Sequence, residues 1–141
     1  MTKIPTDLQI LDVVYNRYYD NFQAYSNENR IRNSKIYVPI DVKEIAKRLN
    51  VDTDIVFGRL YYHLNEKFGY KNDDGSTVEF FALRAGDDRH CINFPYLASV
   101  LSDLKDQNKK YQTSTLISIL SLVIAILSII LSIIISIFGK C

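Results

Sequence analysis

The side chains that most often carry enzymatic chemistry are few in this chain of 141 residues. It has two histidines, His63 and His90, and two cysteines, Cys91 and Cys141. His90 and Cys91 are adjacent on a stretch that predicts a β-strand, where neighbouring side chains point to opposite faces, so we do not expect them to share a metal ion or to act as base and nucleophile. We interpret them as a half-buried strand pair and expect no enzyme activity, cofactor or metal.

Two acidic turns and the motifs that the sequence lacks narrow the chemistry further. Residues 73–75 and 86–88 each combine two aspartates with a glycine, which is typical of turns but supplies too few ligands for a calcium loop. The sequence has no glycine-rich phosphate loop, serine-centred nucleophile elbow or HExxH motif. A disulfide scaffold and a disordered chain are also excluded, because the cysteines are two and 48% of the residues are hydrophobic.

The most distinctive segment is residues 116–138, which contain 18 apolar residues, five serines and no charge, proline or glycine. A helix of this length is about 34 Å long, enough to cross the roughly 30 Å hydrocarbon core of a bilayer. The segment therefore predicts one transmembrane helix in contact with the lipid bilayer. The alternative is a core helix, but the rest of the chain is too short to enclose one that is apolar on all faces.

The charges around this segment predict its orientation. Lys105, Lys109 and Lys110 precede it and only Lys140 follows it, which by the positive-inside bias places the N-terminal domain in the cytoplasm, at the inner membrane of a cell. The charges spread through the first thirty residues predict that no signal peptide is present. Only residues 139–141 follow the apolar segment, so we expect the chain to be tail-anchored. Cys141 is either an incidental terminal thiol or a cross-link to a neighbouring chain.

Small residues recur at alternating steps of three and four along one face of the apolar segment: Ser114, Ser118, Ser121, Ala125, Ser128 and Ser132. Such a face, the serine face below, lets two helix backbones approach closely, and hydroxyls can bond across the contact. We therefore predict a homo-oligomer held through this helix. Two alternatives stay open: each serine can bond its own chain one turn back, or the face can line a water-filled pore.

The residues before the membrane segment predict an α+β domain. Its expected elements are a helix over residues 6–22, a loop over 26–35, a short strand over 36–38, and helices over 41–49 and 53–68. Asp41 and Glu44 form a capping-box pattern in which Asp41 caps the second helix and Glu44 reaches back. Asp52 caps the third helix and Gly69 ends it.

The stretch IDVKEIAKRLNVDTDIVFGRLYYHL resembles a helix-turn-helix. A small residue, Ala46, lies in the middle of its first helix, a short turn is centred on Asn50, and Val56 follows Ala46 by ten residues as a core position. Asn50 stands where glycine is common, which is acceptable because asparagine tolerates a positive φ. Gly58 falls inside the third helix and costs about 1 kcal/mol relative to alanine.

Two β-prone runs, residues 77–83 and 90–94, flank a turn at residues 85–88 and predict a hairpin. The succession of helix, short strand, two helices and hairpin resembles the winged helix-turn-helix fold over about residues 6–95. In that resemblance the domain has three helices plus a β-hairpin wing.

The resemblance implies DNA binding, with the third helix in the major groove. The charges oppose it, because residues 35–70 hold six basic and five acidic side chains and residues 71–89 hold three basic and five acidic ones. A wing with net negative charge is repelled by phosphate. We therefore favour an unidentified cytoplasmic protein over DNA as the partner. The candidate surface is the outward side of the third helix: Arg59, Tyr62, His63 and Lys67.

No proline or glycine follows Pro95 until after Phe138, which predicts one helix of about 44 residues. The expected divisions are the domain (1–95), a juxtamembrane helix (96–112), the transmembrane helix (113–138) and a short tail (139–141). Three interpretations of the juxtamembrane part stay open. It can extend the serine face as a coiled coil, form a flexible link over residues 106–110, or pack on the domain core through Leu97, Val100, Leu101 and Leu104.

The leading hypothesis is a membrane-anchored cytoplasmic adaptor or sensor that binds a partner protein and self-associates through its transmembrane helix. One alternative is a membrane-tethered DNA-binding transcription regulator. Another is a small membrane-disrupting effector.

Overall fold

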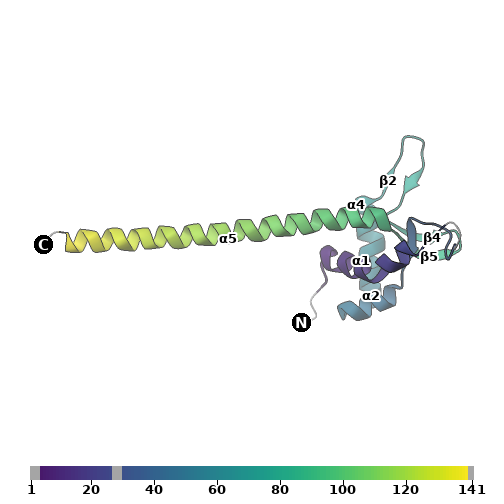
Figure 1. Cartoon of the computed structure of the whole chain (residues 1–141), viewed down its shortest axis with the longest axis horizontal. Coiled ribbons are helices and arrows are strands. Elements are labelled where there is room, and N and C mark those ends of the chain that lie inside the picture. Colours follow the sequence, from purple (N-terminus) through teal and green to yellow (C-terminus); the bar gives the residue numbers. More distant parts are fainter. Residues whose placement is uncertain (1–3, 27–29, 140–141) are drawn as a thin grey trace. The chain divides into compact units, whose positions relative to one another are not determined.

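The structure is a computed structural model that describes residues 4–26 and 30–139. Lys140 and Cys141, which carry part of the orientation prediction and the cross-link hypothesis, lie outside the described residues, as do residues 27–29 of the predicted loop. The fold is α+β, as predicted, and the chain divides into two units, Met1–Asp103 and Leu104–Cys141. Figure 1 shows the helices and strands of both units.

The predicted succession of helix, short strand, two helices and hairpin is present, with one further hairpin before the predicted one. The elements are α1 (Asp7–Gln23), β1 (Tyr37–Pro39), α2 (Val42–Leu49), α3 (Thr53–Gly58), η1 (Arg59–Leu64), α4 (Asn65–Phe68), β2 (Tyr70–Lys71), β3 (Thr77–Val78), β4 (Phe81–Ala85), β5 (Asp88–Asn93) and α5 (Phe94–Phe138). The predicted third helix is the run of α3, η1 and α4, in which η1 is a wider π-helical turn.

Side-chain caps define the ends of the short helices. Thr6 and Gln9 cap α1 with reciprocal hydrogen bonds of 2.9 and 3.2 Å between side chain and main chain. Asp41 caps α2, as predicted, because its carboxylate accepts from two main-chain N–H groups of the first turn. Asn50 follows α2 with a φ of 53°, the left-handed conformation expected at this turn.

The predicted back-bond from Glu44 to Asp41 is wrong. The main-chain N–H of Asp41 donates instead to the hydroxyl of Tyr18 on α1, at 2.7 Å. The Glu44 carboxylate binds the guanidinium groups of Arg17, at 2.6 Å, and of Arg48, at 3.1 Å. The hydrogen bond with Arg17 is the main cause that lowers the pKa of Glu44. A charge-assisted bond to arginine is stronger than one to a neutral main-chain donor, so Glu44 links α2 to α1.

The sheet has three antiparallel strands in the order β1-β5-β4. β4 and β5 form the predicted hairpin, and Gly86 and Asp87 are its two turn residues. Gly86 has a φ of 66°, which favours glycine at the first position of this turn.

The predicted strand over residues 77–83 is wrong in its first part. Its first two residues form β3, which pairs with β2 in a separate hairpin that the sequence did not predict. The break falls at Glu79 and Phe80, and the main-chain N–H groups of Phe80 and Phe81 donate to the side-chain oxygen of Asn65 at 2.9 and 3.1 Å. This amide of α4 takes the place of a strand partner, so the run cannot continue as one strand.

The core of the first unit lies between its helices and the sheet. Fully buried side chains from both fill it: Ile10, Leu11, Val14, Val38, Ile45, Val56, Leu60, Leu64, Phe80, Phe81, Ile92, Phe94 and Leu97. The helix α1 supplies Ile10, Leu11 and Val14 to this core, and the third helix supplies Val56, Leu60 and Leu64.

One charged side chain, Arg32, is also buried. Its guanidinium donates to the main-chain oxygens of Asn21 and Phe22 near the end of α1, at 2.6 and 3.2 Å, and to those of Ser34 and Lys35, at 2.8 and 3.0 Å. Burial lowers the pKa of this guanidinium. Arg32 therefore fastens the loop after α1 to the end of that helix.

The helix α5 is continuous through residues 106–110, so these residues do not form a non-helical link. Leu97, Val100 and Leu101 are buried, which confirms that they pack on the domain core and means that a coiled coil cannot start from them. Leu104 is only half-buried.

The described side chains from residue 104 onward belong to the second unit, and those of residues 116–138 are all exposed. Their mean hydropathy over the most apolar 18 residues is 3.0. The chain therefore contains one helix, among the described residues, that is long and apolar enough to cross a membrane.

Candidate functional site

Arg59 and His63 lie on η1 next to Asp7, the first residue of α1. The Arg59 guanidinium forms an ion pair with one carboxylate oxygen of Asp7, and Nε2 of His63 lies 3.3 Å from the other oxygen. The Asp7 side chain is only 15% exposed. Two of the four residues predicted for the partner surface therefore also contact Asp7, and through it they link the third helix to α1.

Tyr62 and Lys67, the other two predicted surface residues, are open to solvent. Tyr62 is 72% exposed, and its ring packs edge-on against the rings of Phe57 and Tyr61, with centroids 6.5 and 5.0 Å apart. The ammonium group of Lys67 lies 5.1 Å from the ring of Phe68. Tyr62, His63 and Lys67 are thus exposed on the third helix, and the side chain of Arg59 is 33% exposed.

An open cleft of about 520 Å³ lies beside η1 and the β4–β5 hairpin, and sequence reasoning missed it. The side chains that line it are aromatic, apolar and charged: Tyr61, Glu79, Leu83, Arg84, Arg89 and His90. Arg84 and Arg89 stand directly opposite each other on the two strands, and both are exposed. Like charges in this arrangement destabilise a hairpin. A bound anion would relieve this repulsion, so the cleft is a candidate site for binding a negatively charged group.

A signal for this arginine pair is present in the sequence. Arg84 precedes Gly86 by two residues and Arg89 follows Asp87 by two. In a hairpin with a two-residue turn, residues at equal distances from the turn face each other. Counting charges over residues 71–89 hid this pairing, because the nearby acidic residues outnumber the arginines.

Cys91 and His90 have different surroundings in the structure. Cys91 is fully buried, and burial chiefly, with the charge of Asp88 second, raises its pKa to about 11, so its thiol stays protonated at neutral pH. The ring of His90 stacks on Phe81 and meets Phe57 edge-on, at 6.2 and 5.7 Å. Within residues 4–26 and 30–139, no group of three His, Cys, Asp or Glu side chains is placed to hold a metal ion.

The six residues of the serine face are all exposed on α5. The hydroxyls of Ser118, Ser121 and Ser128 each donate to the main-chain oxygen four residues earlier, at 2.9 Å. These bonds satisfy the hydroxyls within the chain, as one of the alternatives requires. They leave the small-residue surface uncovered, so close approach of a second helix does not require breaking them.

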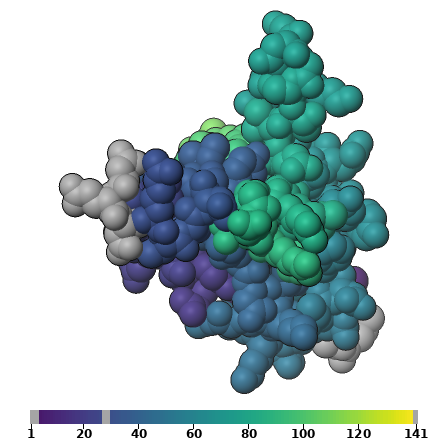
Figure 2. Space-filling view, turned by 90° about the vertical axis from the view of Figure 1, so that its right-hand side faces the viewer, coloured from purple at the N-terminus to yellow at the C-terminus, as the bar shows by residue number. Residues whose placement is uncertain are grey.

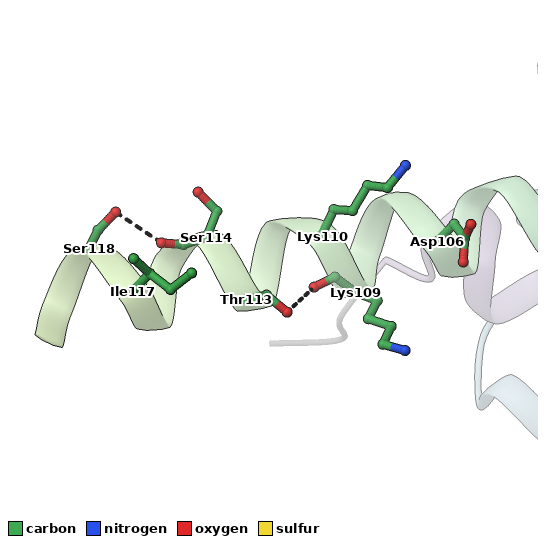
Figure 3. A pocket seen from close by; sticks show the side chains of 7 residues that line it. All are labelled: Asp106, Lys109, Lys110, Thr113, Ser114, Ile117 and Ser118. Atoms are coloured by element: carbon green, nitrogen blue, oxygen red, sulfur yellow. Dashed lines mark hydrogen bonds between the residues drawn. The ribbon is translucent and has the colours of Figure 1, made fainter.

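Figure 3 shows the end of this face nearest the domain. Lys109 and Lys110 point to different sides of α5, and the hydroxyls of Thr113 and Ser118 bond the main-chain oxygens of Lys109 and Ser114. The shallow hollow that these residues line is formed by side chains of α5 alone, so it is an open helix surface and not an enclosed pocket.

Comparison of the chain with protein-family models, with curated proteins and with solved structures gave no match. The candidate function therefore rests on the geometry and the charges of this chain.

Proposed function

We propose that the protein is a single-pass membrane adaptor or sensor whose domain lies at the cytoplasmic face of the inner membrane and binds a partner protein. The observation that carries the proposal is a contrast within α5. Its first turns contribute buried side chains to a core, whereas its last 23 residues are exposed and consist of apolar residues and serines. Exposing so many apolar side chains is favourable in lipid and unfavourable in water.

The order of the elements supports the winged helix-turn-helix resemblance for the domain. The helices α1, α2 and the third helix, the strand β1 and the β4–β5 hairpin follow one another as that resemblance requires. The β2–β3 hairpin between α4 and β4 is an addition to this order.

Two contacts favour a protein over DNA as the partner. Arg59, the side chain best suited to read a guanine, is paired with Asp7. The turn of the β4–β5 hairpin is held by its own chain, since Asn33 donates to Asp88 through its main-chain N–H and its side-chain amide, at 2.9 and 3.4 Å. We therefore propose Tyr62 and Lys67 as the centre of the partner surface.

Fractionation of the full chain and of a variant that lacks residues 116–138 tests the membrane anchor. We expect the full chain to stay with the membranes after an alkaline wash and the shortened chain to be released. Recovery of the full chain in the soluble fraction would contradict the anchor.

Gel-shift titration of the detergent-solubilised full chain against genomic DNA fragments tests the choice of partner. We expect no sequence-selective shift. Salt-sensitive, selective binding that Lys67→Ala weakens would replace the adaptor by a membrane-tethered transcription regulator. Leakage of dye from vesicles that contain the chain would favour a membrane-disrupting effector instead.

Self-association through the serine face completes the proposal. Replacing Ser121 and Ser128 together with isoleucine covers the small-residue surface, and we expect energy transfer between labelled copies in vesicles to show association weakened by about fivefold. Replacing Ile119 and Ile126 with leucine is the control, because these residues lie off that face. Equal association in both variants would show that the serine face is not the contact.

A further inference from the structure

The β2–β3 hairpin stands out from the surface of the domain, where Figure 2 shows it as the teal projection at the top of the view. Residues 70–77 are all exposed. In its turn, the main-chain N–H and the hydroxyl of Ser76 both donate to Asp74, at 2.9 and 2.6 Å, and the N–H of Asn72 donates to the main-chain oxygen of Ser76 at 2.8 Å. These bonds give the tip, with the carboxylates of Asp73 and Asp74, a defined shape before any partner arrives.

The tip and the arginine cleft carry opposite charges that the chain itself does not pair. In the part of the chain that the structure describes, no ion pair includes Asp73, Asp74, Arg84 or Arg89. Hydrogen bonds from Ser76 lower the pKa of Asp74, so this carboxylate is ionised at neutral pH. Both sets of charges lie in the unit Met1–Asp103. Because they form no ion pair there, each set is available to a charged group of a second molecule.

We propose that the tip of the β2–β3 hairpin of one copy docks into the arginine cleft of a second copy, with Asp73 and Asp74 against Arg84 and Arg89. The planar guanidinium group of arginine matches a carboxylate with two parallel hydrogen bonds. A carboxylate placed between the two arginines also removes their mutual repulsion across the hairpin. The acidic tip therefore offsets the repulsion between Arg84 and Arg89, which is unfavourable in the isolated chain.

Apolar side chains border both charged surfaces. Leu83, which is 42% exposed, and Tyr61 line the cleft, and Tyr70, which is 51% exposed, lies on β2 beside the tip. Glu79 also lines the cleft, and its charge opposes an incoming carboxylate. The two arginines outnumber it, so the cleft keeps a net positive charge.

The tip and the cleft are different surfaces of the same domain, so the contact is heterologous and can pass from copy to copy or close into a ring. Exposed ion pairs are individually weak. Copies held in one membrane, however, meet at a high effective concentration. The inference goes beyond the proposed function, because it adds a contact between domains that does not involve the serine face.

Energy transfer between full chains in phosphatidylcholine vesicles tests this contact. The labels are placed on Cys141, since the other thiol, Cys91, is buried, and all chains carry Ser121→Ile with Ser128→Ile to remove the helix contact. We expect Arg84→Glu with Arg89→Glu, and separately Asp73→Lys with Asp74→Lys, to weaken association by about fivefold to tenfold. Mixing the two variants restores it, because each cleft then meets a tip of opposite charge.

The control is Lys43→Glu with Lys47→Glu, an equal change of net charge on α2, which leaves association unchanged. The contact is overturned if the arginine variant associates like the parent, or if mixing the two variants restores nothing. It is also overturned if the arginine variant loses association while the aspartate variant keeps it, because the cleft then binds an acidic group from elsewhere. Absence of transfer in the parent at every protein-to-lipid ratio overturns it as well. None of these four outcomes bears on the proposed contact through the serine face, because every chain in this experiment carries Ser121→Ile with Ser128→Ile.

Discussion

The domain and the exposed end of α5 satisfy their polar groups in different ways. In the domain, polar side chains link different elements: Arg32 donates to two main-chain oxygens of its own loop and to two of α1, and Asn65 of α4 accepts from two main-chain N–H groups at the start of β4. In residues 116–138, the serine hydroxyls that bond do so within one turn of their own helix. The polar side chains of the domain thus join different elements, whereas these serine hydroxyls bond only their own helix.

The burial of apolar side chains also differs between the two regions. Those of the domain bury one another, whereas those of residues 116–138 are exposed, which is favourable only in apolar surroundings. The same substitution therefore has different consequences in the two regions. A new charge is tolerated on the surface of the domain but not in the helix, and the loss of a polar side chain matters in the domain core far more than in the helix.

The largest expected effect is the loss of membrane insertion when two lysines replace Ile124 and Ile130. A lysine near the centre of a transmembrane helix costs about 2.5 to 3.5 kcal/mol, so the pair costs about 5 to 7 kcal/mol. We expect the variant to leave the membrane fraction on alkaline extraction.

Leucine at Ile124 and Ile130 is the matched control, which keeps the apolar character and stays with the membranes. If the lysine variant also stays, residues 116–138 do not cross the bilayer, and the contrast between the two regions fails.

Within the domain, Arg32→Met has the largest expected effect. Methionine fills a similar volume but leaves four main-chain oxygens without their donor, so we expect the free energy of unfolding to fall by about 2 to 4 kcal/mol. Urea unfolding followed by tyrosine fluorescence measures it, since the chain has ten tyrosines and no tryptophan. Arg30→Met, at an exposed position two residues away, is expected to change the free energy of unfolding by less than about 0.5 kcal/mol. Equal stability of the two variants would mean that Arg32 does not hold the loop.

The regular elements could be predicted from the sequence because their signals are local. The helix α1, the cap at Asp41 and the left-handed Asn50 each depend on residues that are near one another in sequence, and the structure has all three. The apolar helix is local in the same sense, because a run of residues 116–138 without charge needs no knowledge of the rest of the chain.

The parts that could not be predicted depend on pairs that are far apart in sequence. Arg59 looked outward on a regular helix, but it meets Asp7, 52 residues earlier, where the helix widens into the π-helical turn η1. Glu44 looked like half of a capping box, but Arg17 lies beside it in the fold. The facing of Arg84 and Arg89 is different, because it follows from the two-residue turn between them and was missed only because charges were counted over the whole segment.

The ion pair between Asp7 and Arg59 provides a smaller test of these distant contacts. Asp7→Asn removes the charge that Arg59 and His63 face, and because the pair is partly exposed we expect the free energy of unfolding to fall by only about 1 kcal/mol. Chemical unfolding at neutral pH measures it. Asp87→Asn, in the exposed hairpin turn, is the control and should leave stability unchanged within about 0.5 kcal/mol. A loss no larger at Asp7 than at Asp87 would mean that the third helix does not need this clamp.

The smallest expected effect concerns Gly58, a glycine inside the third helix, whereas α5 has no glycine from Phe94 to Phe138. Gly58 has a φ of −60°, which any residue adopts in a helix, and a Cβ added there would lie 3.8 Å from the nearest side-chain atom, on Tyr62, an ordinary contact distance. Alanine restricts the unfolded chain more than glycine does, so we expect Gly58→Ala to raise the free energy of unfolding by about 0.5 to 1 kcal/mol. A fall in stability would show instead that the π-helical turn beginning at Arg59 depends on the freedom of a glycine before it. The third helix would then need a glycine in its backbone, whereas α5 has none, and this would be a second difference between the two helices besides the exposure of their apolar side chains.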